Sequence, residues 1–340
     1  MMILFPALAA ATTLMLTAFV RRYALKRALF DHPNHRSLHT SPTPRGGGIV
    51  IVLSVLAYIV YGLLTGIVDR GVGIALIGGG SLIAAAGSAD DIRSLSAETR
   101  LAVHFIASIW AVWWLGGLPV IDVGLTSAQV GFGGGVAAVF LLVWAVNLYN
   151  FMDGIDGLAS LEALFLGGCG GLLLMARNAT SLASVSFVVF GAALGFLYWN
   201  WEPAKIFMGD VGSGFLGFTF GTLAIWSENS HALPIIVWFI LASAFVVDAS
   251  ITLVRRVPGG MWRHAHRTHA YQRAVMSGLT HSQVVLTIAG FNLLLGGLGA
   301  IAAFKPSFLL PAAAASVVLG GFLYFLVGRM QPFVLERPSA

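Results

Sequence analysis

Long apolar runs separated by short polar segments cover the whole chain, and this pattern predicts an all-α protein that crosses a membrane many times. Each run is near the roughly 20 residues that a helix needs to span a bilayer. We expect eleven such helices in a single domain that covers residues 1–340. The expected spans are about 1–20, 48–67, 71–88, 101–118, 131–149, 158–176, 182–199, 212–227, 232–254, 283–303 and 308–327.

Basic residues orient this layout. The first apolar run is followed by Arg21, Arg22, Lys26 and Arg27, whereas a signal peptide carries its positive charge before the run. With the N-terminus outside, sixteen of the 19 Lys and Arg residues lie in inner segments, as the positive-inside rule requires. The cytoplasmic segments are then expected at about 21–47, 89–100, 150–157, 200–211 and 255–282, with a short tail at 328–340.

Composition agrees with this class of protein. The chain is 58% apolar and 10% charged, whereas soluble domains carry about 25% charged residues. The net charge of +5 follows from the basic inner segments, so it does not indicate nucleic-acid binding. The single Cys169 excludes an intrachain disulfide. Three runs of glycine are expected to let helices pack closely.

The stretch from Asn147 to Gly157 places two carboxamides and two carboxylates between long apolar runs. Ionisable groups at the edge of the hydrocarbon are costly unless they face a partner. Asp153 and Asp156 are three residues apart, so on a helix they would share a face. This arrangement suits Mg²⁺, which favours a few carboxylates together with substrate phosphates. The alternative is a polar turn between membrane helices.

The first two inner loops carry further polar groups. The first contains three histidines together with Arg36 and Arg45, which indicates contact either with phosphate or with anionic lipid. The second begins with Asp90 and Asp91, and adjacent helical residues point about 100° apart. We therefore expect these two carboxylates to have separate roles. The alternative is a helix end that has simply become polar.

The last two inner loops add one carboxylate and a basic cluster. Asp210 is followed by small residues that open a helix, and helix N-termini bind phosphate. In the fifth loop, His264, His266 and His269 could suggest zinc. Arginines surround these histidines, however, and favour phosphate binding instead. Asp248, in the preceding span, is expected to be a buried polar partner rather than a catalytic residue.

Together these segments resemble the polyprenyl-phosphate N-acetylhexosamine-1-phosphate transferase superfamily, of the glycosyltransferase family 4 type. Its members move a sugar phosphate from a UDP-amino sugar to a membrane polyprenyl phosphate and release UMP. The resemblance extends from Asp31 to about Arg273 and rests on four motifs in order. They are Asp-His-Pro-Asn-His-Arg with the later Pro-Arg-Gly-Gly-Gly, the Asp90-Asp91 pair, Asn-Leu-Tyr-Asn-Phe-Met-Asp-Gly-Ile-Asp-Gly-Leu-Ala, and Phe-Met-Gly-Asp-Val-Gly-Ser.

The resemblance implies a role for each matched residue. Asp210 and Asp153 would coordinate Mg²⁺, with Mn²⁺ as an alternative ion. Asn150 would line the diphosphate site, and Asp90 or Asp91 would contact the polyprenyl phosphate. Asp156 and Phe207 would hold the uracil, one by hydrogen bonds and the other by stacking. Further substrate-binding residues are expected to be Asn147, Arg45, His266, Arg267, His269, Tyr271 and Gln272.

The fifth loop differs from the nearly contiguous histidines of many relatives. Its sequence resembles that of a branch that initiates O-antigen or related surface polysaccharides, often with a 6-deoxy amino sugar such as N-acetylfucosamine or N-acetylquinovosamine. The residues concerned are His266-Arg267-Thr268-His269-Ala270-Tyr271-Gln272. We expect Arg267 and His269 to bind the diphosphate, and Tyr271 and Gln272 to shape the sugar pocket. The resemblance also implies undecaprenyl phosphate as the acceptor and a multi-pass location in the bacterial inner membrane. A homodimer is compatible with the sequence, which does not determine the oligomeric state.

Two other functions fit parts of the pattern. A UDP-sugar or lipid-linked sugar transporter also places charges on broken helices, but near the bilayer midplane and often in repeated halves. A membrane phosphatidyltransferase also uses aspartates and Mg²⁺, but its array has two more spaced aspartates on the same helix. After Asp156, this chain has no aspartate until Asp210.

Overall fold

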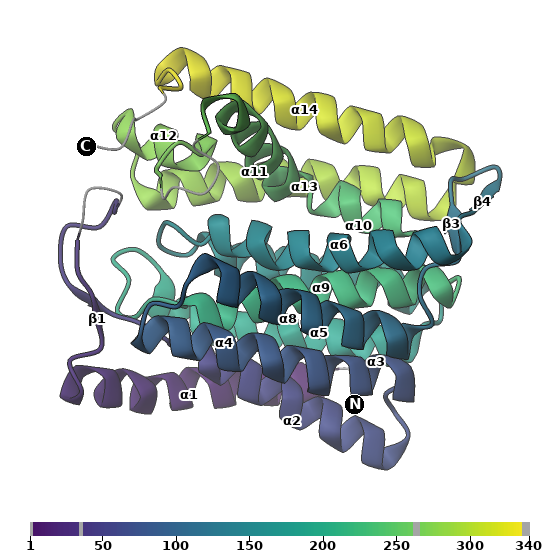
Figure 1. The fold of residues 1–340 in the computed structure, drawn as a ribbon, viewed down its shortest axis with the longest axis horizontal. Helices are drawn as coiled ribbons and strands as arrows, with labels where there is room; N and C mark the ends of the chain where they lie inside the picture. The colour runs from purple at the N-terminus through teal and green to yellow at the C-terminus, as the bar shows by residue number, and fades with distance from the viewer. Residues whose placement is uncertain (1–2, 34–36, 261–265, 335–340) are drawn as a thin grey trace.

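The computed structural model describes residues 3–33, 37–260 and 266–334. Most of these residues form helices that run side by side in one bundle (Figure 1). The main helices are α1 (Leu4–Lys26), α2 (Ile49–Thr65), α3 (Arg70–Ala75), α4 (Ser81–Ile92), α5 (Ala97–Leu115), α6 (Gly131–Phe151), α7 (Leu158–Ala176), α8 (Thr180–Asn200), α9 (Asp210–Asn229), α10 (Ile235–Leu241), α11 (Ser243–Arg256), α12 (Ala270–Met276), α13 (His281–Phe304) and α14 (Leu309–Met330).

Among the described residues, three shorter helical segments join these helices. A π-helical segment, η1 (Leu76–Gly80), joins α3 to α4 in one continuous rod. Its glycines admit neighbouring aromatic rings, because a Cβ at Gly78 would collide with Trp110 and one at Gly79 with Phe218. The other two are short 3₁₀ turns, η2 (Val257–Gly259) and η4 (Pro306–Phe308). The glycine run therefore serves close helix packing, as predicted.

The apolar runs correspond to helices as predicted. Within the described residues, seven helices are long and apolar enough to cross a membrane, or up to eight if α10 and α11, bent by 80°, form one span. The α2 helix is shorter than these, and α5 and α9 do not meet the same test. Each expected span coincides with a helix or a helix pair, but the number eleven and the orientation stay predictions.

Two short two-stranded sheets amend the all-α prediction. Strand β1 (Phe30–Asp31) pairs with β2 (Thr43–Pro44), and β3 (Val120–Asp122) pairs with β4 (Ser127–Gln129), both antiparallel. Each pair lies in a connection between helices, where a local ladder gives backbone groups hydrogen-bond partners.

Helices also extend into several of the expected inner segments. Helix α1 continues through Lys26 into the segment that we expected to be the first loop. Helix α9 begins at Asp210, and the expected fifth loop contains α12. These loops are therefore more helical than the hydropathy pattern alone predicted.

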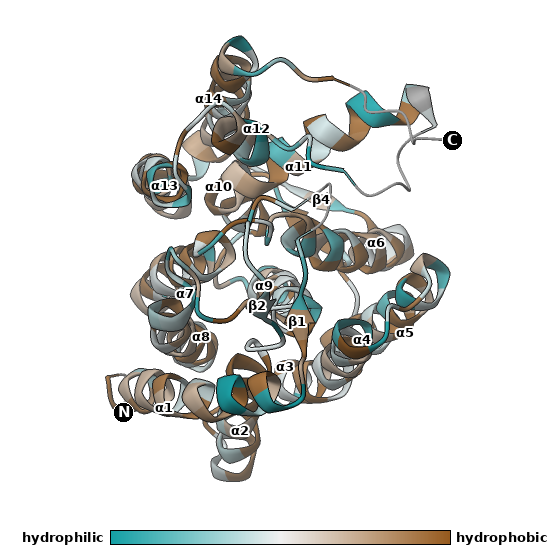
Figure 2. Ribbon diagram, turned by 90° about the vertical axis from the view of Figure 1, so that its left-hand side faces the viewer, coloured by the Kyte–Doolittle hydropathy of each residue, from teal (hydrophilic) through white to brown (hydrophobic). Residues whose placement is uncertain are grey.

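Helix α9 lies at the centre of the bundle, with α4, α6, α7 and α8 around it (Figure 2). Its side chains are buried along almost the whole length. Glycines allow its N-terminal turn to lie against other backbones, since a Cβ at Gly212 would collide with Gly48 and one at Gly87 with Asp210. This close packing places the start of α9 beside the ends of α2 and α4.

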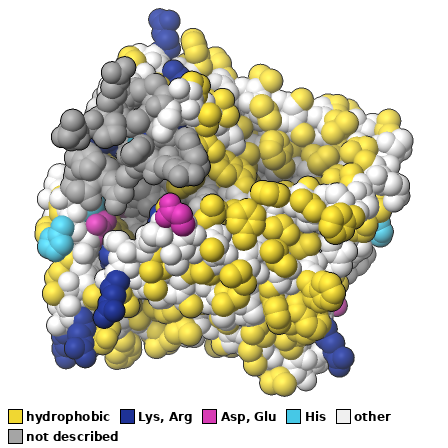
Figure 3. Space-filling model, viewed as in Figure 1, with side chains coloured by type: hydrophobic (Ala, Val, Ile, Leu, Met, Phe, Trp, Pro, Cys, Tyr) yellow, Lys and Arg dark blue, Asp and Glu magenta, His cyan; other side chains and the backbone are white. Residues whose placement is uncertain are grey.

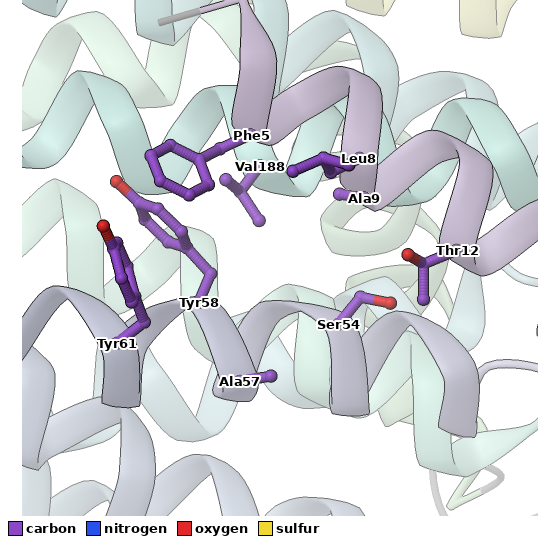
Figure 4. Close-up of a pocket in the computed structure, with 9 residues that line it drawn as sticks. All are labelled: Phe5, Leu8, Ala9, Thr12, Ser54, Ala57, Tyr58, Tyr61 and Val188. Atoms are coloured by element: carbon purple, nitrogen blue, oxygen red, sulfur yellow. The ribbon is translucent and has the colours of Figure 1, made fainter. Parts of the chain in front are cut away.

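The surface separates apolar and charged regions. On the face in Figure 3, hydrophobic side chains cover the middle of the bundle, and charged side chains lie mainly toward its two ends. A shallow apolar pocket lies between α1 and α2, where Phe5, Tyr58 and Tyr61 gather beside Ser54 and Val188 (Figure 4). None of the predicted site residues lines this pocket.

Candidate active site

The segment that carries Asp153 and Asp156 is not helical, so the two side chains do not have the shared helix face that their spacing would give within a helix. Helix α6 ends at Phe151, and a turn precedes the start of α7 at Leu158. Gly157 has φ 82°, a left-handed conformation that allows the chain to enter α7 sharply. The turn directs Asp153 and Asp156 toward different neighbours.

Asp91 caps the N-terminus of α9. Its Oδ1 accepts a hydrogen bond from Asp210 N–H (3.1 Å), and its Oδ2 accepts one from Val211 N–H (3.3 Å). Gly209 precedes the helix with φ 76°, and a Cβ there would collide with the Asp91 carboxylate. An acidic side chain suits this position, because helix N-termini expose unpaired N–H groups and a positive dipole end.

Asp90 faces a different set of partners. Its Oδ1 accepts a hydrogen bond from Leu95 N–H (2.6 Å), and its Oδ2 lies 3.1 Å from Nη1 of Arg100. The same Arg100 nitrogen lies 3.3 Å from Oδ2 of Asp210. The two adjacent aspartates therefore have different partners, and their separate roles stay a prediction. Arg100, which links Asp90 to Asp210, was not predicted, although it lies one helical turn into α5.

Asp153 completes a group of four carboxylates, the carboxylate cluster, formed by Asp90, Asp91, Asp153 and Asp210. Burial, followed by the negative charges of Asp210 and Asp91, raises the pKa of Asp153 well above its usual range. Within the described part of the chain, no donor hydrogen-bonds to the Asp153 carboxylate. Asn150 lies beside the cluster, where its Nδ2 donates to Ser213 Oγ (3.2 Å) on the first turn of α9.

This cluster has the chemistry of a cation site. Carboxylates that face one another repel unless a cation or a proton lies between them. Within the residues that the structure describes, no three His, Cys, Asp or Glu side chains could hold a metal ion by themselves. Mg²⁺ needs fewer, because it commonly takes one or two carboxylates and completes its shell with water and substrate phosphates. The residues present therefore fit Mg²⁺ together with a phosphate ligand.

Backbone hydrogen bonds join the end of the first loop to the fourth loop, next to Asp210. Gly47 N–H donates to Phe207 O and Gly48 N–H donates to Met208 O, each at 2.9 Å. The positive charge of Arg45 acts on Asp91, and the binding of substrate by Arg45 stays a prediction. Asn147 precedes Asn150 on α6. Its Nδ2 donates to Val143 O (2.7 Å) and lies 3.3 Å from His104 Nδ1.

Of the two expected uracil-binding residues, Asp156 contacts the fourth loop and Phe207 lies on it. Asp156 Oδ2 accepts a hydrogen bond from Ala204 N–H (2.9 Å), and Asp156 N–H donates to His281 Nδ1 (3.3 Å). Phe207 is partly buried, and its ring contacts the edge of His39, with centroids 4.9 Å apart. Asp156 therefore joins the motif to the fourth loop and to α13. His281 was not predicted as a neighbour.

The fifth loop is built around Asp248. Its Oδ1 accepts from Ala270 N–H (2.8 Å) and its Oδ2 from Tyr271 N–H (3.1 Å), at the start of α12. Nδ1 of His269 lies 3.4 Å from the same Oδ1. Asp248 is thus the buried polar partner that we predicted.

The fifth loop is joined to the end of α6 through Tyr271 and is also stabilised by contacts within the loop. Tyr271 Oη donates to Phe151 O (2.9 Å), and Gln272 Oε1 accepts from His269 N–H (3.2 Å). Burial, then the charge of His269, lowers the pKa of His266 to about 3, so His266 is neutral near pH 7. Arg267 is partly buried, and His264 lies outside the described residues. The loop is therefore attached to the segment that leads to Asp153.

Sequence comparison identifies related proteins. Residues 73–228 match the family described as Glycosyl transferase family 4. The chain is 30% identical, over 82% of its length and 78% of the relative, to the probable undecaprenyl-phosphate N-acetylglucosaminyl 1-phosphate transferase of Bacillus subtilis (strain 168). It is also 30% identical to the decaprenyl-phosphate N-acetylglucosaminephosphotransferase of Mycobacterium tuberculosis (strain ATCC 25618 / H37Rv), over 96% of this chain and 87% of the relative.

A third relative is named for a different activity. The phospho-N-acetylmuramoyl-pentapeptide-transferase of Moorella thermoacetica is 28% identical, over 82% of this chain and 91% of that protein. These similarities extend over most of both chains in each case. The chain therefore belongs to glycosyl transferase family 4, within the polyprenyl-phosphate N-acetylhexosamine-1-phosphate transferase superfamily.

Proposed function

We propose that this protein transfers an N-acetylhexosamine 1-phosphate from a UDP-amino sugar to undecaprenyl phosphate in a bacterial inner membrane, and releases UMP. The carboxylate cluster is the observation that carries this proposal, because it brings Asp90, Asp91, Asp153 and Asp210 from two helices and one turn to one place. The names of the relatives, which refer to polyprenyl phosphates, support the same reaction.

The reaction joins two anions. A phosphate oxygen of the acceptor attacks the sugar-linked phosphorus, and the bond from this phosphorus to the bridging oxygen breaks, so UMP leaves with that oxygen. Such transfers depend mainly on positioning and on charge stabilisation. Asp153 and Asp210 would hold Mg²⁺, which would neutralise phosphate charge when bound. Arg100 already bridges Asp90 and Asp210, and Arg45 and Arg267 would bind phosphate oxygens.

The sugar and the pathway are finer parts of the proposal. The fifth-loop sequence from His266 to Gln272 supports a 6-deoxy amino sugar and a role in initiating O-antigen or a related polysaccharide. The deciding assay follows UMP release by purified protein in detergent, with undecaprenyl phosphate and a panel of UDP-amino sugars. UMP release supports the transferase. Saturable UDP-sugar binding without any UMP would instead support a carrier.

Metal dependence is tested in the same assay. Removing divalent cations with EDTA should abolish UMP release, because hard carboxylate oxygens suit Mg²⁺. Adding Mg²⁺ or Mn²⁺ should restore it. Full activity in excess chelator would remove the metal from the proposal while leaving the transfer itself intact.

Orientation is tested with a matched pair of cysteines in a variant that lacks Cys169. Ser94 is exposed beside the carboxylate cluster, and Leu125 is 81% exposed in the hairpin at the other end of the bundle. An impermeant thiol reagent should label Leu125→Cys from outside, and Ser94→Cys only after the membrane is opened. The reverse pattern would place the site outside.

A further inference from the structure

One buried pair in the bundle lies outside the proposed catalytic residues. Glu162 of α7 and Asn292 of α13 are each 1% exposed, and Asn292 Nδ2 donates to Glu162 Oε2 at 2.7 Å. No Lys, Arg or His of the described residues forms an ion pair with Glu162. An ionised carboxylate buried without a cation carries a large desolvation penalty, so this environment favours the neutral acid.

Two buried oxygens of the pair lack a hydrogen-bond donor while Glu162 is ionised. Glu162 Oε1 and Asn292 Oδ1 are both buried, and neither has a hydrogen-bond partner in the described structure. A carboxylate oxygen and an amide oxygen are both acceptors, so they cannot bond to each other. A single proton on Glu162 Oε1 would convert one of the two into a donor and satisfy both oxygens at once.

We propose that Glu162 is a protonated positioning residue, whose Oε1–H donates to Asn292 Oδ1 while Asn292 Nδ2–H donates to Glu162 Oε2. Two hydrogen bonds then close a ring between α7 and α13. A carboxylic acid and a primary amide have matching donor and acceptor groups for such a ring. Both side chains are neutral in it, so no charge remains buried between the helices.

The position of this pair connects it to the proposed site. Helix α7 begins directly after the turn that carries Asp153, and Tyr149 Oη, at the end of α6, donates to Ala159 O of α7 (2.9 Å). Helix α13 begins at His281, which accepts a hydrogen bond from Asp156 N–H. The Glu162–Asn292 ring would hold these two helices together behind that turn. Its effect on activity rests on the proposed function.

Infrared difference spectroscopy tests the protonation without any turnover. The spectrum of wild type minus Glu162→Gln, near pH 7 in detergent, should contain the carbonyl stretch of a protonated carboxylic acid. Glu228→Gln is the matched control, because Glu228 is equally buried but accepts two backbone N–H bonds, which stabilise an ionised carboxylate. Its difference spectrum should show carboxylate bands. Carboxylate bands in the Glu162 difference would overturn the proposal.

Kinetics test the positioning. Glu162→Gln should keep kcat within about twofold, because an amide pair can form the same two hydrogen bonds. Glu162→Ala should lower kcat by roughly tenfold or more, with a smaller change in KM, because small displacements of reacting groups are costly. Equal loss in both variants would contradict a neutral ring. Absence of UMP release in wild type would defeat the proposed function, while the infrared result would still decide the protonation.

Discussion

The two ends of the bundle use buried carboxylates in opposite ways. At the hairpin end, where β3 and β4 lie (Figure 1), Glu228 is 3% exposed and accepts hydrogen bonds from Asp122 N–H (2.7 Å) and Ile235 N–H (2.6 Å). At the carboxylate end, Asp153 has no donor in the described structure and faces the negative charges of Asp210 and Asp91.

This difference separates structural carboxylates from candidate functional ones. A carboxylate that accepts backbone N–H bonds is satisfied by the fold and has little left to offer a ligand. Carboxylates that repel one another retain unused acceptors, and such perturbed groups gather at functional sites. Asp91 lies between the two cases, because it caps α9 yet belongs to the cluster. The comparison therefore predicts unequal effects of chemically similar substitutions.

The largest effect should come from Asp210→Asn. Removing this charge should lower kcat for UMP release by roughly a hundredfold to a thousandfold, the scale seen when one electrostatic stabiliser is lost. Glu228→Gln removes the same charge at the hairpin end and should leave kcat close to wild type. Similar losses in both variants, with both proteins folded, would break the comparison.

A smaller effect is expected in the fifth loop. Arg267→Lys should lower kcat/KM by about tenfold with every accepted UDP-sugar, because lysine does not reproduce the planar fork that guanidinium offers to phosphate. The measurement is kcat/KM for two UDP-sugars that differ only in the 6-hydroxyl group. An unchanged kcat/KM in this variant would remove Arg267 from phosphate binding.

Tyr271→Phe is tested with the same two UDP-sugars, by comparing kcat/KM for each. The hydroxyl of Tyr271 already donates to Phe151 O, so its loss should slow both sugars by the same factor, about threefold to tenfold for one hydrogen bond. Our sequence-based expectation was instead a change in the ratio between the two sugars. A changed ratio would support that expectation and place Tyr271 in the sugar pocket.

At the hairpin end, Glu228→Ala should affect stability rather than catalysis. It leaves two buried N–H groups, those of Asp122 and Ile235, without acceptors, at a cost of about 1–3 kcal/mol each. Thermal unfolding in detergent should show a lower Tm, while folded protein retains wild-type kcat. An unchanged Tm would mean that water replaces the lost acceptor.

The smallest effect concerns Glu202, which is a structural carboxylate at the carboxylate end. Burial alone would raise its pKa, but hydrogen bonds from Ser282 and from His281 N–H lower the pKa below its usual range. A lowered native pKa stabilises the fold above the unfolded value of about 4.3, and this contribution is lost as pH falls through the native pKa. The Tm of wild type should therefore be higher than the Tm of Glu202→Gln near pH 7. This difference in Tm should become smaller as the pH falls through the native pKa of Glu202.

Much of the site was predictable because its chemistry is concentrated in short motifs. Asp90, Asp91, Asp153 and Asp210 were identified as polar groups at the ends of apolar runs, where they are costly without a function. The 100° step of a helix predicted separate roles for Asp90 and Asp91, and the structure gives them different partners. The spacing of Asp153 and Asp156 was uninformative, because residues three apart share a face only within a helix and α6 ends at Phe151.

The sequence by itself determined that this is a helical membrane protein of a recognisable family, because apolar run length and motif order are local properties of the chain. Only the tertiary structure decided which carboxylates are already satisfied. Asp156 and Asp248 bind backbone groups far away in the sequence, and Arg100 reaches Asp210 across 110 residues. Hydrogen-bond partners depend on distance in space, and only the folded chain sets that distance.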